Sequence, residues 1–278
     1  MKLVDCSYLN SFGGETIVKL FLNSLPANQL NTFFFLFDKR LNKDLYREIP
    51  TTLYITINSS HINRYFFYKK RKSEFQLILC LANIPPPIRI QQKTIIYFHN
   101  ALLLNLFKNE LSFKSRFIFY LKKSYLKFFN SSSYIWVVQT ALMEKSLKDI
   151  FNNNPIYKYP IFQSVYYSSL KDKNIFFYPS SLLTHKNHSR LLAGFLMAAK
   201  CTNKEIKLHL TIKKEKLFLN EFPKNLKVEY HGTLSENRVN ELYNSCEFVI
   251  YPSLIESFGL PLIEASNYSC KVIASNLP

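Results

Sequence analysis

The sequence predicts an α/β protein built from two doubly wound units, each a parallel sheet with helices on both faces. Continuous apolar runs alternate along the chain with longer stretches of helical spacing, which is typical of strands buried on both faces. The 278 residues are 47% hydrophobic, enough for a sizeable core. The alternation is interrupted once, at "NNNPIYKYPIFQ" (152–163), and then restarts.

The first unit is expected to begin with a strand at residues 2–6, followed by a loop that contains Gly13 and Gly14. Five further apolar runs predict strands: 32–38, 53–57, 76–82, 94–99 and 134–139. Helical spacing predicts the helices 15–25, 60–73, 112–129 and 140–150. In such folds ligands bind beyond the carboxyl ends of the strands.

Asparagines and prolines at 152–163 indicate a linker, so we expect two domains, at residues 1–165 and 166–278. The second unit is predicted to contain the strands 174–179, 206–212, 226–232, 247–252 and 271–275. Its helices are expected at 187–200, 235–245 and 260–268. The sequence stops directly after the last strand, so we expect the second domain to be incomplete and the chain to be C-terminally truncated.

Composition narrows the classes of partner. The net charge of +17 favours anionic partners such as nucleic acid, an acidic membrane surface or phosphorylated substrates. No nucleic-acid motif accompanies it, so we expect no nucleic-acid partner. The five cysteines are scattered and show no metal-binding spacing, which indicates reduced core residues in a cytoplasmic protein and no metal site. No apolar run reaches the length of a membrane span.

The stretch "YPSLIESFGLPLIEAS" (251–266) places two acids, Glu256 and Glu264, on either side of a glycine and a proline. Pro261 suits the first turn of a helix, where its missing N–H has no acceptor. The free N–H groups near Ser257, Phe258, Gly259 and Leu260 would then form an anion site at the helix N-terminus. A diphosphate bound there would lie between two carboxylates that can accept hydrogen bonds from sugar hydroxyls. On spacing alone, a capped helix with an unrelated acid in its second turn explains the pattern equally well.

The same string resembles the donor-binding signature of retaining GT-B glycosyltransferases, specifically glycosyltransferase family 4. Further segments are similar to parts of that family: 83–100, 135–147, 176–195 and 231–253. The resemblance implies a GT-B-like fold of two Rossmann-like domains facing a cleft. It also implies an N-terminal acceptor-side domain and a C-terminal nucleotide-sugar-binding domain.

The resemblance assigns roles to individual residues. Glu256 matches the acid that holds donor-sugar hydroxyls, and Glu264 matches the acid that holds the ribose. The donor-binding backbone would be that of Ser257, Phe258, Gly259 and Leu260.

Lys186 matches the lysine that steadies the leaving diphosphate, where a cation offsets developing charge without a metal. The alternative is a solvated lysine at a helix start. Ser180 and Ser181 stand where the family usually has an arginine, so either the charge of the diphosphate is neutralised less fully or Arg190 substitutes for the arginine.

The resemblance also assigns substrate contacts to a histidine and to two glycines of the first unit. His99 follows a strand in "YFHNALL" and matches a histidine that contacts the donor sugar; the alternative is a histidine that caps a strand end. Gly13 and Gly14 match the glycine loop that lets the backbone approach the diphosphate and acceptor, whereas an ordinary turn is the alternative.

The resemblance implies transfer of a sugar, with retention, from a nucleotide-diphosphate sugar to a hydroxyl of a glycan or lipid-linked acceptor, without a cofactor or metal. Such a hexosyltransferase would serve bacterial surface polysaccharide synthesis (lipopolysaccharide, O-antigen or capsule). The alternative is a truncated, non-catalytic relative that only binds nucleotide or a partner.

A basic, aromatic stretch bears on the acceptor. Residues 112–129 place aromatic residues at helical spacing among lysines, and 65–72 adds a second such cluster. These segments fit peripheral contact with anionic lipid at the inner face of the cytoplasmic membrane, while an ordinary helix with an apolar core face is the alternative.

Overall fold

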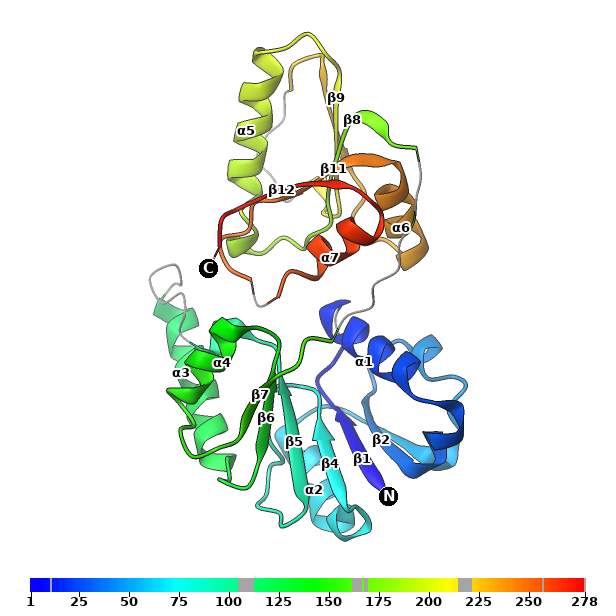
Figure 1. Ribbon diagram of the computed structural model, residues 1–278, viewed down its shortest axis with the longest axis vertical. Coiled ribbons are helices and arrows are strands. Elements are labelled where there is room, and N and C mark those ends of the chain that lie inside the picture. Colours follow the sequence, from blue (N-terminus) through cyan, green and yellow to red (C-terminus); the bar gives the residue numbers. More distant parts are fainter. Residues whose placement is uncertain are drawn as a thin grey trace. The chain divides into compact units, whose positions relative to one another are not determined.

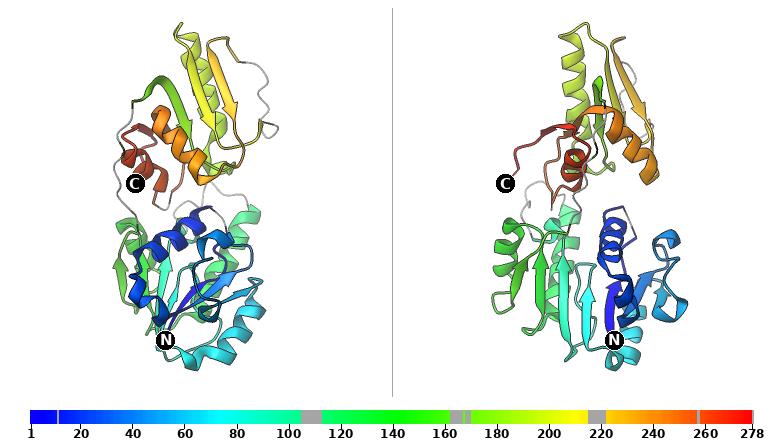
Figure 2. Two further views of the ribbon diagram at one scale, coloured as in Figure 1. Left: turned by 90° about the vertical axis from the view of Figure 1, so that its right-hand side faces the viewer. Right: turned by 45° about the vertical axis from the view of Figure 1, so that its right-hand side comes forward.

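The computed structural model describes residues 1–10, 12–104, 113–161, 167, 170–214, 222–256 and 258–277, with the backbone alone at 12, 102 and 113–116. The chain divides into two compact units, Met1–Ile161 and Phe162–Pro278, whereas the sequence placed the boundary after residue 165 (Figures 1 and 2). Each unit is an α/β structure with one parallel sheet, which confirms the predicted fold class.

The sheet of unit 1 has the strand order β3-β2-β1-β4-β5-β6-β7, and every neighbouring pair is parallel. Its strands are β1 (Lys2–Cys6), β2 (Phe33–Asp38), β3 (Tyr54–Ile57), β4 (Leu77–Cys80), β5 (Lys93–Phe98), β6 (Ile135–Val138) and β7 (Ile156–Lys158). The chain winds outward from β1 to β3 and then returns to β4 on the other side of β1. The carboxyl ends of β1 and β4 therefore form the switch point at which such sheets bind ligands.

Helices cover both faces of this sheet. The helices are α1 (Phe12–Ser24), α2 (His61–Arg71), α3 (Phe113–Phe129) and α4 (Ala141–Lys148). One core contains Val4, Phe35 and Phe37 of the strands with Ile17 and Val18 of α1. The opposite core is formed between the strands and the other three helices, and its side chains include Tyr68, Trp136 and Leu147.

The sheet of unit 2 has the order β10-β9-β8-β11-β12 and is also parallel throughout. Its strands are β8 (Asp172–Tyr178), β9 (Ile206–Leu210), β10 (Leu226–Tyr230), β11 (Cys246–Tyr251) and β12 (Lys271–Ala274). The winding direction reverses between β8 and β11, so the switch point of this unit lies at their carboxyl ends.

Three helices pack on the sheet of unit 2: α5 (His188–Lys200), α6 (Glu236–Ser245) and α7 (Leu260–Asn267). The α5 side chains Leu191, Leu192 and Phe195 pack with Leu208 on one face. On the other face, α6 and α7 pack against Phe177 and Val249. Short 3-10 turns complete the described chain at Ala27–Thr32, Lys43–Leu45, Thr51–Leu53, Lys72–Glu74, Ala101–Leu104 and Thr184–Lys186.

Two expectations from the sequence need correction. Residues 156–158, expected within a linker, form strand β7, because Trp136 donates to the oxygen of Pro155 and Tyr159 donates to that of Val138. Gly13 and Gly14, expected in a loop, lie in the first turn of α1, which begins at Phe12.

Four of the five cysteines are buried as expected, and Cys201 is exposed. Among the helices that the structure describes, none combines the length and apolar character that crossing a bilayer requires.

Candidate active site at the switch point of unit 2

The loops after β8 and β11 are held together at the carboxyl edge of the sheet of unit 2. Asn187 Nδ2 donates to the oxygen of Pro252 at 3.1 Å, and the N–H of Leu254 donates to the oxygen of His185 at 2.8 Å. Asn187 has a left-handed backbone (φ 59°), which ends the turn Thr184–Lys186 and starts α5. These bonds fix the segment that carries Lys186 beside the segment that carries Glu256.

Lys186 and Glu256 form an ion pair across this junction. Lys186 Nζ donates to Glu256 Oε1 at 2.5 Å, and the two side chains keep 16% and 17% of their exposure. Lys186 Nζ also lies 5.4 Å from the ring centroid of Tyr251, the last residue of β11. The pair is thus partly shielded but still accessible to a ligand.

Helix α7 starts beside this pair, as the sequence predicts. Gly259 caps the helix with a left-handed backbone (φ 83°), and Pro261 follows in the first turn. A Cβ at Gly259 would lie 3.2 Å from Leu262 Cδ1 and 3.9 Å from Tyr251 Cε1, so glycine satisfies both the backbone and the packing. At the start of α7, Pro261 has no N–H and the N–H of Leu262 donates to the oxygen of Gly259 at 2.9 Å, so the N–H of Leu260 is the first one that has no acceptor within the helix. Ser257 lies outside the described residues, while Phe258 directly precedes the cap.

Glu264 lies on α7 one turn beyond Leu260, where Tyr243 of α6 donates its hydroxyl to Oε2 at 2.7 Å. Burial raises the pKa of Glu264, although the hydrogen bond from Tyr243 opposes this effect. The tyrosine fixes one carboxylate oxygen, and the other remains for a hydroxyl ligand.

Tyr251 connects the two acids electrostatically. Its pKa is raised first by burial and then by the charge of Glu256, with a smaller contribution from Glu264. Both carboxylates therefore act on one buried ring at the carboxyl end of β11.

Sequence reasoning missed several residues that support this site. Tyr178, at the end of β8, donates to the oxygen of Lys186 at 2.7 Å and lies 3.3 Å from Ser253 Oγ. His188 is 3% exposed, and neither of its ring nitrogens has a hydrogen-bond partner among the residues that the structure describes. Arg190, the expected substitute for the missing arginine, is exposed on α5. The signal for Tyr178 was its place near the carboxyl end of the predicted strand 174–179.

In unit 1, His99 follows β5 and is bonded to the end of β4. The ring Nε2 lies 3.1 Å from the oxygen of Leu81 and 3.0 Å from Asn83 Nδ2. The main-chain N–H of His99 donates to Asn83 Oδ1 at 2.6 Å. Burial lowers the pKa of His99 to about 4, so the ring is neutral at physiological pH. These contacts are those of a strand-end histidine, and they leave Nδ1 as the ring atom for any ligand.

The two glycines of unit 1 differ from each other. A Cβ at Gly14 would lie 3.1 Å from Leu9 Cα, so glycine is needed there for α1 to pack against the segment after β1. A Cβ at Gly13 would meet no atom of the described residues within 4 Å. Of the pair, only Gly13 leaves space beside the backbone for a ligand.

Comparison with known proteins finds a family match to unit 2. Residues 166–278 match the family model "Glycosyl transferases group 1". This match contains Lys186, Glu256, Gly259 and Glu264 together. A comparison with curated proteins found no match.

Solved structures are similar over both units. Sucrose-phosphate synthase from Thermosynechococcus elongatus aligns with a TM-score of 0.63 at 12% identity, over 100% of this chain and 82% of that one. The lipopolysaccharide outer core galactosyltransferase WaaB aligns with a TM-score of 0.55 at 14% identity, over 99% of this chain and 81% of that one.

The pneumococcal O-GlcNAc transferase GtfA, solved in complex with UDP and GlcNAc, aligns with a TM-score of 0.50 at 12% identity, over 78% of this chain. The alignment spans 46% of GtfA, less than half of that chain. At these identities the similarity establishes the fold, which is that of the GT-B glycosyltransferases.

Proposed function

We propose that this protein is a retaining glycosyltransferase of family 4, which moves a sugar from a nucleotide-diphosphate sugar to a hydroxyl of a glycan or lipid-linked acceptor. The observation that carries the proposal is the Lys186–Glu256 pair beside the N-terminus of α7, at the switch point of unit 2. The group 1 family match over the same residues supports it.

The site offers one group for each part of the donor. The N–H groups at the start of α7 and the ammonium of Lys186 bind the diphosphate. Glu256 and Glu264 accept hydrogen bonds from the hydroxyls of the sugar and the ribose respectively. Donor binding therefore separates Lys186 from Glu256 or bridges the two.

We propose front-face transfer without a metal. The bond between the anomeric carbon and the diphosphate oxygen breaks, and the acceptor oxygen attacks the same face. Its proton passes to the departing phosphate oxygen. Lys186 stabilises the charge that grows on the leaving diphosphate, so the protein contributes positioning and electrostatic stabilisation.

In unit 1 we propose substrate contacts for His99 and for the backbone at Gly13. Burial keeps the His99 ring neutral, so it can offer a hydrogen bond but no charge. The open space at Gly13 is compatible with close approach of a ligand to the backbone.

The test is calorimetric titration of the purified chain with UDP, GDP and their sugar conjugates, followed by a donor-hydrolysis assay. We expect one nucleotide to bind, and Glu264→Ala to weaken it at least tenfold. The matched control is Glu241→Ala on α6, where the acid is exposed and paired with Arg238. Equal binding of every nucleotide to the wild type and Glu264→Ala would contradict the donor site. Binding without hydrolysis or transfer would favour the non-catalytic alternative.

For the acceptor we propose a surface glycan or its lipid-linked precursor, as in lipopolysaccharide, O-antigen or capsule synthesis. The structural similarity to WaaB, a lipopolysaccharide outer core galactosyltransferase, supports this class. The reaction would then take place in the cytoplasm, at the inner face of the cytoplasmic membrane.

An exposed aromatic surface on unit 1 supports membrane contact. Phe117, Leu121 and Phe128 of α3 are 57%, 52% and 74% exposed. On α2, Ile62 and Phe66 are exposed as well, and His61 of α2 contacts Tyr125 and Phe129 of α3. An ordinary core helix would bury such a face, whereas an interfacial helix leaves it for the lipid boundary between flanking lysines.

Sedimentation with phosphatidylglycerol and phosphatidylcholine vesicles tests this surface. We expect binding to the anionic vesicles only, and loss of most of it in Phe117→Ser/Phe128→Ser. Tyr159→Ser, which removes another exposed aromatic of unit 1, serves as the control. Unchanged binding by the double variant would refute the membrane surface without affecting the donor site.

A further inference from the structure

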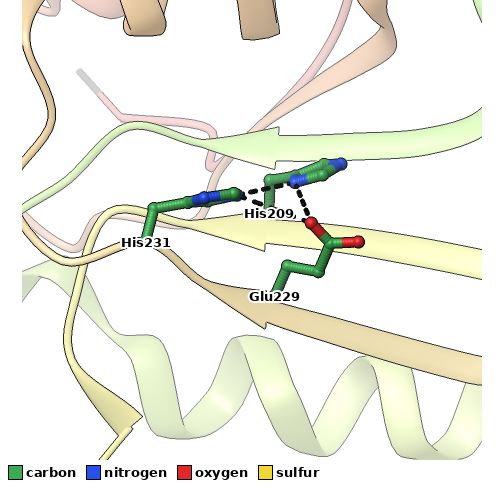
Figure 3. A group of neighbouring side chains, drawn as sticks. All are labelled: His209, Glu229 and His231. Carbon is green, nitrogen blue, oxygen red and sulfur yellow. Dashed lines mark hydrogen bonds and ion pairs between the residues drawn. The ribbon is translucent and has the colours of Figure 1, made fainter.

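Two histidines and a glutamate meet at the carboxyl ends of β9 and β10 (Figure 3). His209 Nδ1 lies 2.8 Å from His231 Nε2 and 3.4 Å from Glu229 Oε2, and His231 Nε2 lies 3.9 Å from the same oxygen. None of these residues takes part in the proposed donor site. Their spacing along the chain is not that of a metal-binding motif, because His209 comes from a different strand from the other two.

The sheet itself brings the three side chains together. Glu229 of β10 pairs in register with His209 of β9, so their side chains leave the same face of the sheet. His231 lies two residues after Glu229, which returns it to that face. The N–H of His231 donates to the oxygen of Leu210 at 2.9 Å and so continues the ladder past the end of β10.

The separations suit a small tetrahedral ion. Zinc binds imidazole nitrogen and carboxylate oxygen at about 2.0–2.1 Å, which places tetrahedral ligand atoms about 3.3 Å apart. The three observed separations lie on both sides of this value. Side-chain shifts that change these separations by about half an ångström would thus equalise them.

We propose that His209, Glu229 and His231 form a binding site for Zn²⁺ or a similar transition-metal ion. Two imidazoles and one carboxylate favour zinc over magnesium or calcium, which prefer oxygen ligands throughout. An imidazole is mostly neutral at neutral pH, so it can bind a metal ion without first having to be deprotonated. Three protein ligands leave a fourth position for water or a ligand.

The surroundings of the triad hold the ligands in place. Lys207 Nζ lies 3.5 Å from Glu229 Oε1, which leaves Oε2 toward the two imidazoles. His209 is 7% exposed, whereas Glu229 keeps 44% of its side-chain exposure, so an ion can enter from solvent on the glutamate side.

The ion would cross-link β9 to β10, which is an edge strand of the sheet. Thr211, two residues beyond His209, accepts a hydrogen bond from the N–H of Ser180 at 2.8 Å and donates to its oxygen at 3.0 Å. The metal would therefore stabilise the strand ends to which the loop after β8 is attached. Its primary effect would be on stability, because an ion that binds only the folded state shifts the unfolding equilibrium.

Competition with a chromophoric zinc indicator tests the site in the chelator-treated, full-length chain. We expect one Zn²⁺ per chain in the wild type, and at least tenfold weaker binding in His231→Ala and in Glu229→Gln. Co²⁺ substitution should give the visible absorption of a tetrahedral ion, and Zn²⁺ but not Mg²⁺ should raise the melting temperature.

Two control variants make the assignment specific. His61→Ala removes an exposed histidine of unit 1, and Cys201→Ser removes the exposed thiol; both should retain full zinc affinity. Glu229→Gln tests the site even if His231→Ala fails to fold, because the substitution conserves the shape of a half-exposed side chain. Circular dichroism checks the fold of each variant. Equal zinc affinity in the wild type and Glu229→Gln, or loss of zinc in either control, would overturn the proposal. Nucleotide binding is measured separately, so the two proposals can fail independently.

Discussion

Each unit places an ion pair near the switch point of its sheet, but the two pairs differ in burial. In unit 1, Asp5 of β1 pairs with Arg64 of α2 at 2.8 Å, and the side chains are 0% and 1% exposed. In unit 2, Lys186 and Glu256 pair at 2.5 Å and keep 16% and 17% of their exposure. The same charge chemistry at the same place in the fold thus serves structure in one unit and remains accessible in the other.

The two ion pairs also differ in the number of hydrogen bonds that they leave available to a ligand. Arg64 also donates to the main-chain oxygens of Pro85 and Ile84, and Tyr68 donates to Asp5 at 2.7 Å. This network is satisfied inside the protein and has little to offer a ligand. Lys186 is a compact ammonium with three donors, one of which contacts Glu256.

Arg64→Ala should have the largest effect on stability. It leaves the Asp5 carboxylate buried without its cation, and breaking a buried pair in this way costs about 3–5 kcal/mol. The measurement is hydrogen exchange of the amides of β1 and β4, which reports the opening of unit 1 separately from unit 2.

Lys148→Ala is the matched control, because its i,i+4 pair with Glu144 is solvent-exposed and contributes little to stability. If Arg64→Ala exchanged no faster than this control, the Asp5–Arg64 network would not be a structural pair.

Lys186→Ala should lower turnover about 10²-fold while changing stability by less than about 1 kcal/mol. The leaving diphosphate loses its cation, but the accessible Glu256 can be hydrated once its partner is removed. Steady-state transfer rates and urea unfolding of the same sample give the two numbers. Lys200→Ala, at the exposed end of α5, is the control. A large loss of stability with unchanged turnover would make the pair structural, like the one in unit 1.

The neighbouring glycines of α1 should respond in opposite directions. Gly14→Ala should destabilise unit 1 by about 1–3 kcal/mol, because the new Cβ would lie 3.1 Å from the backbone of Leu9. Gly13→Ala should stabilise α1 by up to about 1 kcal/mol, since the new methyl group meets no atom within 4 Å. Chemical denaturation of both variants tests the pair. Reduced substrate binding by the more stable Gly13→Ala would indicate that a ligand approaches this backbone.

A buried histidine in each unit predicts acid sensitivity. Burial lowers the pKa of both His99 and His188 to about 4, and Lys186 contributes at His188. Because these values lie below the unfolded-state value of about 6.5, the stabilisation is present above pH 6.5 and is lost as the pH falls toward 4.

His188→Phe should stabilise unit 2 by about 1 kcal/mol at neutral pH, since the ring nitrogens that it removes have no partner. The advantage over the wild type should grow below pH 6.5. Hydrogen exchange in α5 at pH 7 and pH 5 measures both. His99→Phe is the contrasting variant: it removes the contacts of the ring Nε2 with the oxygen of Leu81 and with Asn83 Nδ2, and should therefore destabilise unit 1 at pH 7. A constant difference between wild type and His188→Phe across this pH range would show that His188 does not titrate on unfolding.

Local patterns in the sequence were enough to predict the fold class and the helix at 260–268. Apolar periodicity reports burial on one or two faces, and the fixed φ of Pro261 is a local backbone restriction that needs no distant partner. The same patterns predicted every described strand except β7, which is three residues long and became a strand only by pairing with β6.

Which side chains meet depends on the tertiary structure. The pairing of Lys186 with Glu256, of Glu264 with Tyr243, and of His209 with Glu229 joins residues from separate segments. Such contacts follow from strand order and register, which depend on packing across the whole sheet. Burial, which separates the enclosed Asp5–Arg64 pair from the accessible Lys186–Glu256 pair, also follows from the folded structure, because desolvation is a property of everything that surrounds a charge.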